Sequence, residues 1–202
     1  MECGNVIGIS EFLVENPEMA LVPSRDSSVV LEGVFRFTAA PKGKHGISDS
    51  YHIQINVPDV YPKAVPAVME TMRKIPRDGN HHVNPDGSLC MGSPLRLLQK
   101  INARPSLMGF SETCLIPYLY GVSYKLQTGK DFPFGELPHG GKGVLEDYTE
   151  LLSLRTAEQV RQALILLGMK ERVANKAKCP CGCGRRLGKC SFRNILNKNG
   201  SS

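Results

Sequence analysis

The stretch YHIQINVPDVYPKAVPAV, residues 51–68, carries the clearest fold signal in this chain. Its first part places apolar side chains at every second position: Tyr51, Ile53, Ile55 and Val57. A period of two is that of a β-strand with one face turned to a core. We therefore predict a strand over residues 51–57 and a further short strand within residues 64–71.

The preceding residues extend this pattern into a meander of strands. Residues 27–39 are rich in β-branched and aromatic side chains and predict a strand, and residues 19–21 predict a short one. Residues 41–50, PKGKHGISDS, have the composition of a turn or loop. Residues 6–15 show helical spacing that Asn16-Pro17 ends. Consecutive strands with short connections imply an antiparallel meander.

The chain becomes helical after Cys90. Helices are predicted in residues 93–101, 112–126, 144–154 and 156–168. Thr156 and Gln159 form a capping box at the start of the last of these, and Gly168 is placed to end it. Residues 131–143, rich in glycine and proline, predict a long loop of the kind that is often functional. The expected fold class is therefore α+β.

The composition of the 202 residues indicates a folded protein without a membrane span. A hydrophobic content of 41% supports a packed core, and no apolar run approaches the roughly 20 residues that a membrane helix needs. The start, MECGNVIGISEF, lacks the basic and apolar regions of a secretory signal, so we expect a cytoplasmic location. Seven cysteines in such a chain favour reduced thiols, metal ligands or catalysis over disulfides.

The net charge of +6 is unevenly distributed. Residues 170–202 hold nine Lys or Arg and one acid, whereas residues 1–169 hold 16 basic and 18 acidic residues. The basic tail is therefore expected either to contact nucleic acid or an acidic protein surface, or simply to keep the protein soluble.

Two segments together resemble the ubiquitin-conjugating (UBC) enzyme family. VPDVYPKAVPAV, residues 57–68, is similar to the family's strand followed by Tyr-Pro, and NHHVNPDGSLC, residues 80–90, is similar to its His-Pro-Asn segment running into Gly-x-Leu-Cys. The order of helix, meander, cysteine segment and helices is also that of the family. His82 stands where the family has asparagine, and no Trp follows the cysteine. The likeness is greater to bacterial relatives, to which FGELPHGGKG, residues 134–143, is also similar; these occur in antiphage defence.

The resemblance implies that Cys90 accepts the C-terminus of a ubiquitin-like protein from an activating enzyme as a thioester and passes it to a target amine. A thiolate suits this role because it is the nucleophilic form of cysteine and can hold an acyl group. We expect His82 to donate to the developing oxyanion or to orient the turn that begins at Asn84, helped by backbone N–H groups near Cys90. His139 is a further candidate because its glycine-flanked loop could reach the cysteine.

Other assignments around Cys90 stay open at this point. Asp86, Ser93 and Asp131 are equal candidates for activating a substrate lysine. Cys114 and Cys3 are expected to have no functional role. The chain could instead be a non-catalytic adaptor on the same fold, or a cysteine hydrolase that pairs Cys90 with a histidine. No phosphate-binding glycine motif is present, so ATP-dependent activation is expected of a separate protein.

The tail segment KCPCGCGRRLGKCSF, residues 178–192, concentrates four cysteines: Cys179, Cys181, Cys183 and Cys190. It resembles the SEC-C motif, a small module that binds structural zinc. The last ligand of that motif is replaced by Ser191, so Cys183 is our candidate for the fourth thiolate. Free, redox-prone thiols are the alternative. Arg185, Arg186 and Lys189 would form a basic patch that recruits a partner.

We divide the chain accordingly into three parts. Residues 1–155 are expected to form the UBC-like domain, residues 156–177 a helix and linker, and residues 178–202 the basic zinc-binding tail. The expected partners are the activating enzyme, the ubiquitin-like protein and a target protein.

Overall fold

The computed structural model describes residues 7–24, 26–135 and 140–199. The chain separates into two compact units, residues 1–136 and 137–202. This division falls earlier in the chain than the boundary we drew at residue 155. No helix among the described residues has the length and apolar character needed to cross a bilayer.

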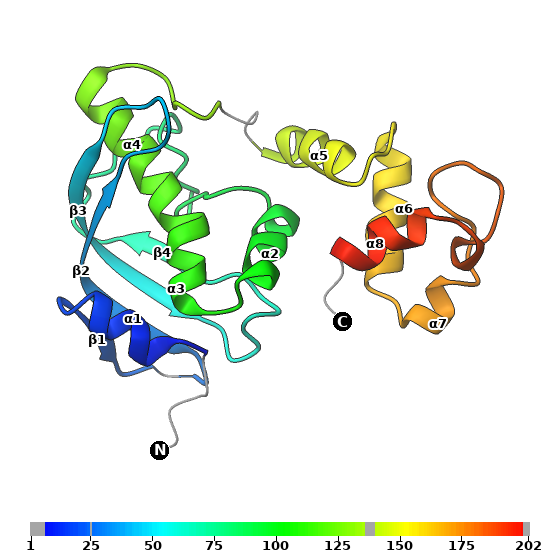
Figure 1. Cartoon of the computed structure of the whole chain (residues 1–202), viewed down its shortest axis with the longest axis horizontal. Coiled ribbons are helices and arrows are strands. Elements are labelled where there is room, and N and C mark those ends of the chain that lie inside the picture. The colour runs from blue at the N-terminus through cyan, green and yellow to red at the C-terminus, as the bar shows by residue number, and fades with distance from the viewer. Residues whose placement is uncertain (1–6, 25, 136–139, 200–202) are drawn as a thin grey trace. The chain divides into compact units, whose positions relative to one another are not determined.

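The first unit is an α+β unit built on one four-stranded antiparallel sheet (Figure 1). Its strands are β1 (Met19–Val22), β2 (Val29–Ala39), β3 (Ile47–Val57) and β4 (Ala67–Glu70), adjacent in the order of the sequence. Its helices are α1 (Ile9–Glu15), α2 (Pro94–Ala103), α3 (Leu107–Phe110) and α4 (Ile116–Thr128), and the π-helical turn η1 (Ser111–Leu115) joins the last two. The antiparallel meander is confirmed.

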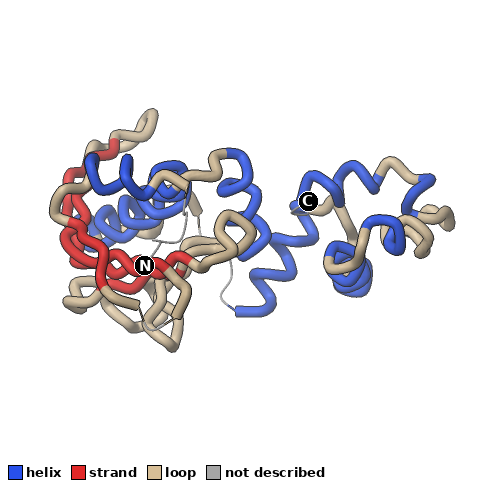
Figure 2. Tube along the Cα trace, turned by 90° about the horizontal axis from the view of Figure 1, so that it is seen from below, coloured by secondary structure: helices blue, strands red, loops and turns tan. Residues whose placement is uncertain are grey.

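The alternation of residues 51–57 decides which face of the sheet enters the core. Tyr51, Ile53, Ile55 and Val57 are all buried, as their spacing predicts. Phe35 of β2 lies on the same face and stacks on Phe12 of α1, with 6.1 Å between ring centroids. Helix α4 packs on β2 and β3 from this side too, so the sheet has one helix-covered face (Figure 2).

The predicted loop over residues 41–50 is wrong in its second half. Strand β3 begins at Ile47, where Ile47 pairs with Ala39 and Asp49 pairs with Phe37. The glycine and serine content of this segment favoured a turn, but eleven residues of ladder pairing with β2 keep it extended. Asp49 is thereby placed on the edge of the core.

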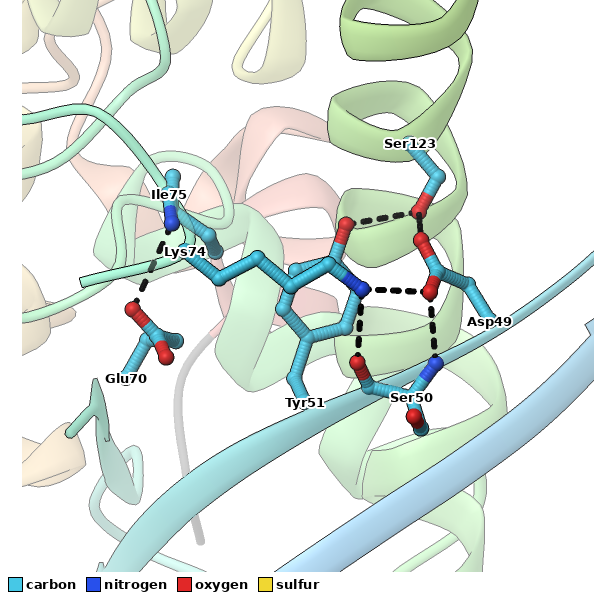
Figure 3. A network of polar contacts seen from close by, with 7 residues as sticks. All are labelled: Asp49, Ser50, Tyr51, Glu70, Lys74, Ile75 and Ser123. Atoms are coloured by element: carbon cyan, nitrogen blue, oxygen red, sulfur yellow. Dashed lines mark hydrogen bonds and ion pairs between the residues drawn. The ribbon is translucent and has the colours of Figure 1, made fainter. Parts of the chain in front are cut away.

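A polar network joins β3 to α4 (Figure 3). The Ser123 hydroxyl donates to Asp49 Oδ2 at 2.8 Å and lies 2.7 Å from the Tyr51 hydroxyl. Lys74 Nζ contacts Asp49 Oδ1 at 2.5 Å and lies 4.2 Å from the centroid of the Tyr51 ring. Burial opposes ionisation of Asp49, yet the hydrogen bonds from Lys74 and Ser123 outweigh it and lower its pKa.

The second unit consists of helices and loops in its described residues (Figure 2). The helical elements are α5 (Gly140–Leu151), α6 (Ala157–Leu167), α7 (Glu171–Ala174), the 3-10 turn η2 (Leu187–Lys189) and α8 (Phe192–Asn199). The capping box of Thr156 and Gln159 is confirmed, with Gly168 ending α6. The predicted loop over residues 131–143 is wrong at its end, because α5 begins at Gly140; Gly143 and Tyr148 are buried, so packing overrides the glycine signal.

Candidate active site and candidate metal centre

Cys90 follows a tight turn that closes on itself. The Asn84 amide donates to the Ser88 carbonyl at 2.8 Å, and the Gly87 amide donates back to the Asn84 carbonyl at 2.9 Å. Gly87 has a φ of 88°, a left-handed conformation that glycine adopts without strain. The sequence Asn-Pro-Asp-Gly therefore forms the turn that its composition favours.

The turn is anchored to the sheet just before Cys90. The Leu89 amide donates to the Val68 carbonyl of β4 at 2.8 Å, and Ser88 bridges to Met69. Leu89 itself is buried in the core, whereas Cys90 is half-buried. A fixed backbone with a partly exposed thiol is what a nucleophilic cysteine requires.

The backbone at Cys90 is also tied to His82. The Cys90 amide donates to the His82 carbonyl at 2.8 Å, so this N–H is already used and is a poor candidate for the oxyanion contact that we expected. The Tyr118 hydroxyl donates to the His81 carbonyl at 2.8 Å and reaches the His82 carbonyl at 3.3 Å. His82 has a φ of 52°, which is uncommon for a residue other than glycine.

Aromatic packing orients the His82 ring. The His82 and Phe132 rings meet edge to face, with 4.9 Å between centroids and an interplanar angle of 82°. Phe132 in turn lies on Gly121 of α4, where an added Cβ would come within 2.5 Å of the ring. The sequence motif contained no signal for Phe132 or Tyr118; a glycine inside the predicted helix was the one hint of a close approach.

The other predicted site residues are Asn84 and His139. Asn84 is exposed, and its side-chain amide donates to Ser88 Oγ at 2.9 Å, so it stabilises the turn. His139 lies outside the described residues. Cys114, for which we expected no functional role, is buried in the core, and burial raises the pKa of its thiol.

The candidates for lysine activation now differ in their surroundings. Asp86 is exposed; its Oδ1 accepts hydrogen bonds from the amide and hydroxyl of Ser88, which lower the pKa of Asp86. Ser93 is buried at the start of α2. His81, inside the segment of residues 80–90, is paired with Asp78 at 2.9 Å between Nδ1 and Oδ1, and this hydrogen bond lowers the pKa of Asp78.

The second unit brings together all the predicted cysteine ligands. The sulfur atoms of Cys179, Cys181, Cys183 and Cys190 lie within 4.8 Å of one another. The Sγ separations are 3.2 Å for Cys179–Cys181, 3.7 Å for Cys181–Cys190 and 3.6 Å for Cys183–Cys190. Four thiolates at about 2.3 Å from a tetrahedral ion would lie about 3.8 Å apart. The cluster could therefore hold a metal ion.

Local backbone structure explains why the sulfurs converge. The Cys179 amide donates to the Arg185 carbonyl at 2.9 Å, next to an isolated bridge between Lys178 and Arg186. Gly182 and Gly184, with φ of 83° and 75°, turn the chain between these points. Cys190 joins from the end of η2, where its amide donates to the Leu187 carbonyl at 2.9 Å.

Three thiols of the cluster have pKa values shifted in opposite directions by their surroundings. Burial raises the pKa of Cys179 and of Cys181. The Arg185 amide donates to the exposed Cys183 thiol and lowers its pKa to about 6. Thiolates are the form that binds a metal, and Cys183 is the exposed member of the cluster.

Comparison of the chain with protein-family models, with curated proteins and with solved structures gave no match. Arguments about function therefore depend on the residues themselves.

Proposed function

We propose that this chain is a ubiquitin-conjugating-like acyl carrier, which accepts the C-terminus of a ubiquitin-like protein on Cys90 and transfers it to an amine. The observation that carries this proposal is the setting of Cys90: a half-buried thiol whose own amide donates to His82, next to a Leu89 amide that donates to Val68. The order of helix, antiparallel meander, cysteine segment and helices also agrees with the fold that the resemblance implies.

The proposed chemistry is two successive acyl transfers. The Cys90 thiolate attacks the thioester carbonyl presented by the activating enzyme; a new S–C bond forms and the enzyme's own thiolate leaves. A target amine then attacks the Cys90 thioester, loses a proton to a base and expels the Cys90 thiolate. His82 and the amides that follow Cys90 would stabilise the oxyanion that forms in each step.

A gel assay without reductant tests this proposal. The protein is mixed with a candidate activating enzyme, a ubiquitin-like protein and ATP, and we expect an adduct that thiol reagents remove. Cys90→Ala should abolish the adduct, whereas Cys90→Ser should give an ester that resists thiols and is cleaved by base. Cys114→Ala is the matched control, because it removes a cysteine buried away from solvent.

The outcomes also separate the two alternatives. Binding of the ubiquitin-like protein without any adduct would indicate an adaptor. Rapid, Cys90-dependent release of free ubiquitin-like protein from a supplied thioester or amide, with no transfer to added amines, would indicate a hydrolase. Failure to form an adduct with a partner set shown to be active would overturn the carrier proposal.

We further propose that the ion held by the four-cysteine cluster is zinc, in a structural role. Four thiolates suit zinc and leave no open coordination position for catalysis. Arg185, Arg186 and Lys189 are exposed on the loop that the cluster would fix, which supports the expected contact with an acidic partner. A metal assay on freshly purified chain should give about one zinc per chain, and less than about half would contradict the assignment.

A further inference from the structure

Tyr118 is a buried residue of α4 whose hydroxyl serves the segment that leads to Cys90. Its side chain is 7% exposed, and its hydroxyl donates to the His81 carbonyl at 2.8 Å and reaches that of His82 at 3.3 Å. Burial, and then the charge of Cys90, raise the pKa of Tyr118. The hydroxyl therefore remains protonated and acts as a donor.

The same carbonyl connects Tyr118 to Cys90. The His82 carbonyl that Tyr118 reaches also accepts the Cys90 amide at 2.8 Å. Between these contacts His82 holds a φ of 52°, a conformation that persists in a non-glycine residue only when its surroundings impose it. The ring contact with Phe132 involves the His82 side chain, whereas the Tyr118 hydroxyl contacts the carbonyls of the peptide itself.

We propose that Tyr118 is a positioning residue for Cys90: its hydroxyl fixes the carbonyls of His81 and His82, and through them the direction in which the Cys90 thiol is presented. An effect of Tyr118 on acyl transfer rests on the proposed function. An effect of Tyr118 on the backbone of Cys90 does not, so a measurement of that backbone tests the positioning role separately from the carrier function.

Helix α4 also supplies a matched control. Tyr120 is buried like Tyr118, and its hydroxyl donates to the His45 carbonyl at 2.7 Å, in the connection between β2 and β3. Tyr118→Phe and Tyr120→Phe each remove one hydroxyl that serves a loop carbonyl. Only the first of these loops leads to Cys90.

The first measurement is hydrogen exchange of the Cys90 amide, followed by NMR in the full chain. The Cys90 amide donates to the His82 carbonyl, and Tyr118→Phe removes a hydroxyl that contacts this carbonyl. Tyr118→Phe should therefore speed exchange of the Cys90 amide by about tenfold, while Tyr120→Phe should change it by less than about twofold. Equal effects of the two variants, or none, would overturn the proposal.

The second measurement is acylation of Cys90 by a synthetic peptide thioester that ends in Gly-Gly, followed by mass spectrometry across pH. The positioning role predicts that Tyr118→Phe lowers the plateau rate by about tenfold and leaves the pH midpoint unchanged. A shifted midpoint with an unchanged plateau would mean that the hydroxyl acts on the charge of the thiol, which contradicts positioning. If the wild-type chain is not acylated, the carrier proposal fails, and the exchange result still decides the role of Tyr118.

A double variant separates loss of the hydrogen bond from poor folding of Tyr118→Phe, because it relieves the strain at His82 that the hydroxyl is proposed to hold. Glycine adopts a positive φ without strain, so adding His82→Gly should bring Cys90 exchange back to within about threefold of wild type. No recovery in a folded double variant would contradict the mechanism, because the hydroxyl would then do something other than hold a strained peptide.

Discussion

Cys90 and the four-cysteine cluster use the same side chain in opposite arrangements. In the cluster, four sulfurs converge with separations of 3.2 to 3.7 Å between recorded neighbours. Cys90 has no sulfur partner among the described residues; its amide donates to the His82 carbonyl, and the amide of the preceding Leu89 donates to the Val68 carbonyl. A thiol among thiols is suited to a metal, and a lone thiol on a fixed backbone is suited to attack.

The two arrangements also differ in the range of the contacts that build them. Cys179, Cys181 and Cys183 are brought together by turns within a few residues, and Cys190 follows soon after. Cys90 depends on β4 and on Tyr118 of α4, which are remote in sequence. Local spacing therefore predicts the four-cysteine cluster, whereas it says less about the surroundings of Cys90.

Among the substitutions that test this comparison, loss of one candidate metal ligand should cause the largest loss of stability. We expect Cys179→Ser to lose the ion and to destabilise the second unit by several kcal/mol, because apparent zinc binding by small domains reaches about 10 kcal/mol or more. Metal content and thermal unfolding of the full chain measure this. Cys90→Ser should keep both at wild-type values; equal losses in the two variants would remove the distinction between the sites.

The first unit should depend on its polar network rather than on a metal. Ser123→Ala leaves the buried Tyr51 hydroxyl and the Asp49 carboxylate short of a partner, and should cost about 2 kcal/mol. Denaturant unfolding of the first unit measures the loss. Metal content should not change, and a parallel loss of metal would show that the two units are not independent.

Alkylation should distinguish the two kinds of cysteine directly. With metal bound, iodoacetamide should modify Cys90 about tenfold faster than any cluster cysteine, because coordinated thiolates are protected. Peptide mass spectrometry measures each site. A strong chelator should expose the cluster, with the exposed Cys183 modified first. Protection of Cys90 together with reactive cluster thiols would reverse our assignment.

Glycine substitutions in the two turns should have smaller and separate effects. Gly87→Ala and Gly184→Ala both place a side chain at positive φ, at a cost of about 1 to 2 kcal/mol. Gly87→Ala also presses on the Arg77 guanidinium, 3.2 Å from the new Cβ, whereas Gly184 has open space. The first should lower stability of the first unit, and the second should weaken metal binding. Weaker metal binding in Gly87→Ala, or lower stability of the first unit in Gly184→Ala, would contradict the independence of the two turns.

Protonation of Asp49 at low pH should give the smallest change in stability, and this change should be confined to the first unit. The folded state lowers the pKa of Asp49, so its contribution to stability is full above the unfolded pKa near 4 and is lost as pH falls through the folded value. We expect Asp49→Asn to flatten the stability profile below about pH 4, by roughly 1 kcal/mol. Denaturant unfolding at several pH values measures this, and a profile unchanged by the substitution would contradict it. Lys74, Tyr51 and the buried Glu70 face the same network and should be kept intact.

The pattern of residues in the sequence was sufficient to predict local structure where one physical requirement dominated. The period of two in residues 51–57 marked the buried face of β3, and the capping box marked the start of α6, because each depends on neighbouring residues. Pattern failed at residues 47–50 and 140–143. There the intrinsic preference of serine and glycine for turns was overridden by pairing with β2 in one case and by helix packing in the other.

The sequence by itself determined the α+β class, the antiparallel meander and the four cysteines that could hold a metal ion. The class and the meander follow from the order of strand-like and helical segments along the chain, and the cysteine cluster follows from spacing within one short stretch. Only the tertiary structure decided the surroundings of Cys90: the carbonyl of His82 on its amide, the Tyr118 hydroxyl behind that carbonyl, and Phe132 seated on Gly121. The Tyr118 contact joins residues 36 positions apart in the sequence, and no pattern within either segment indicates that contact before the chain has packed.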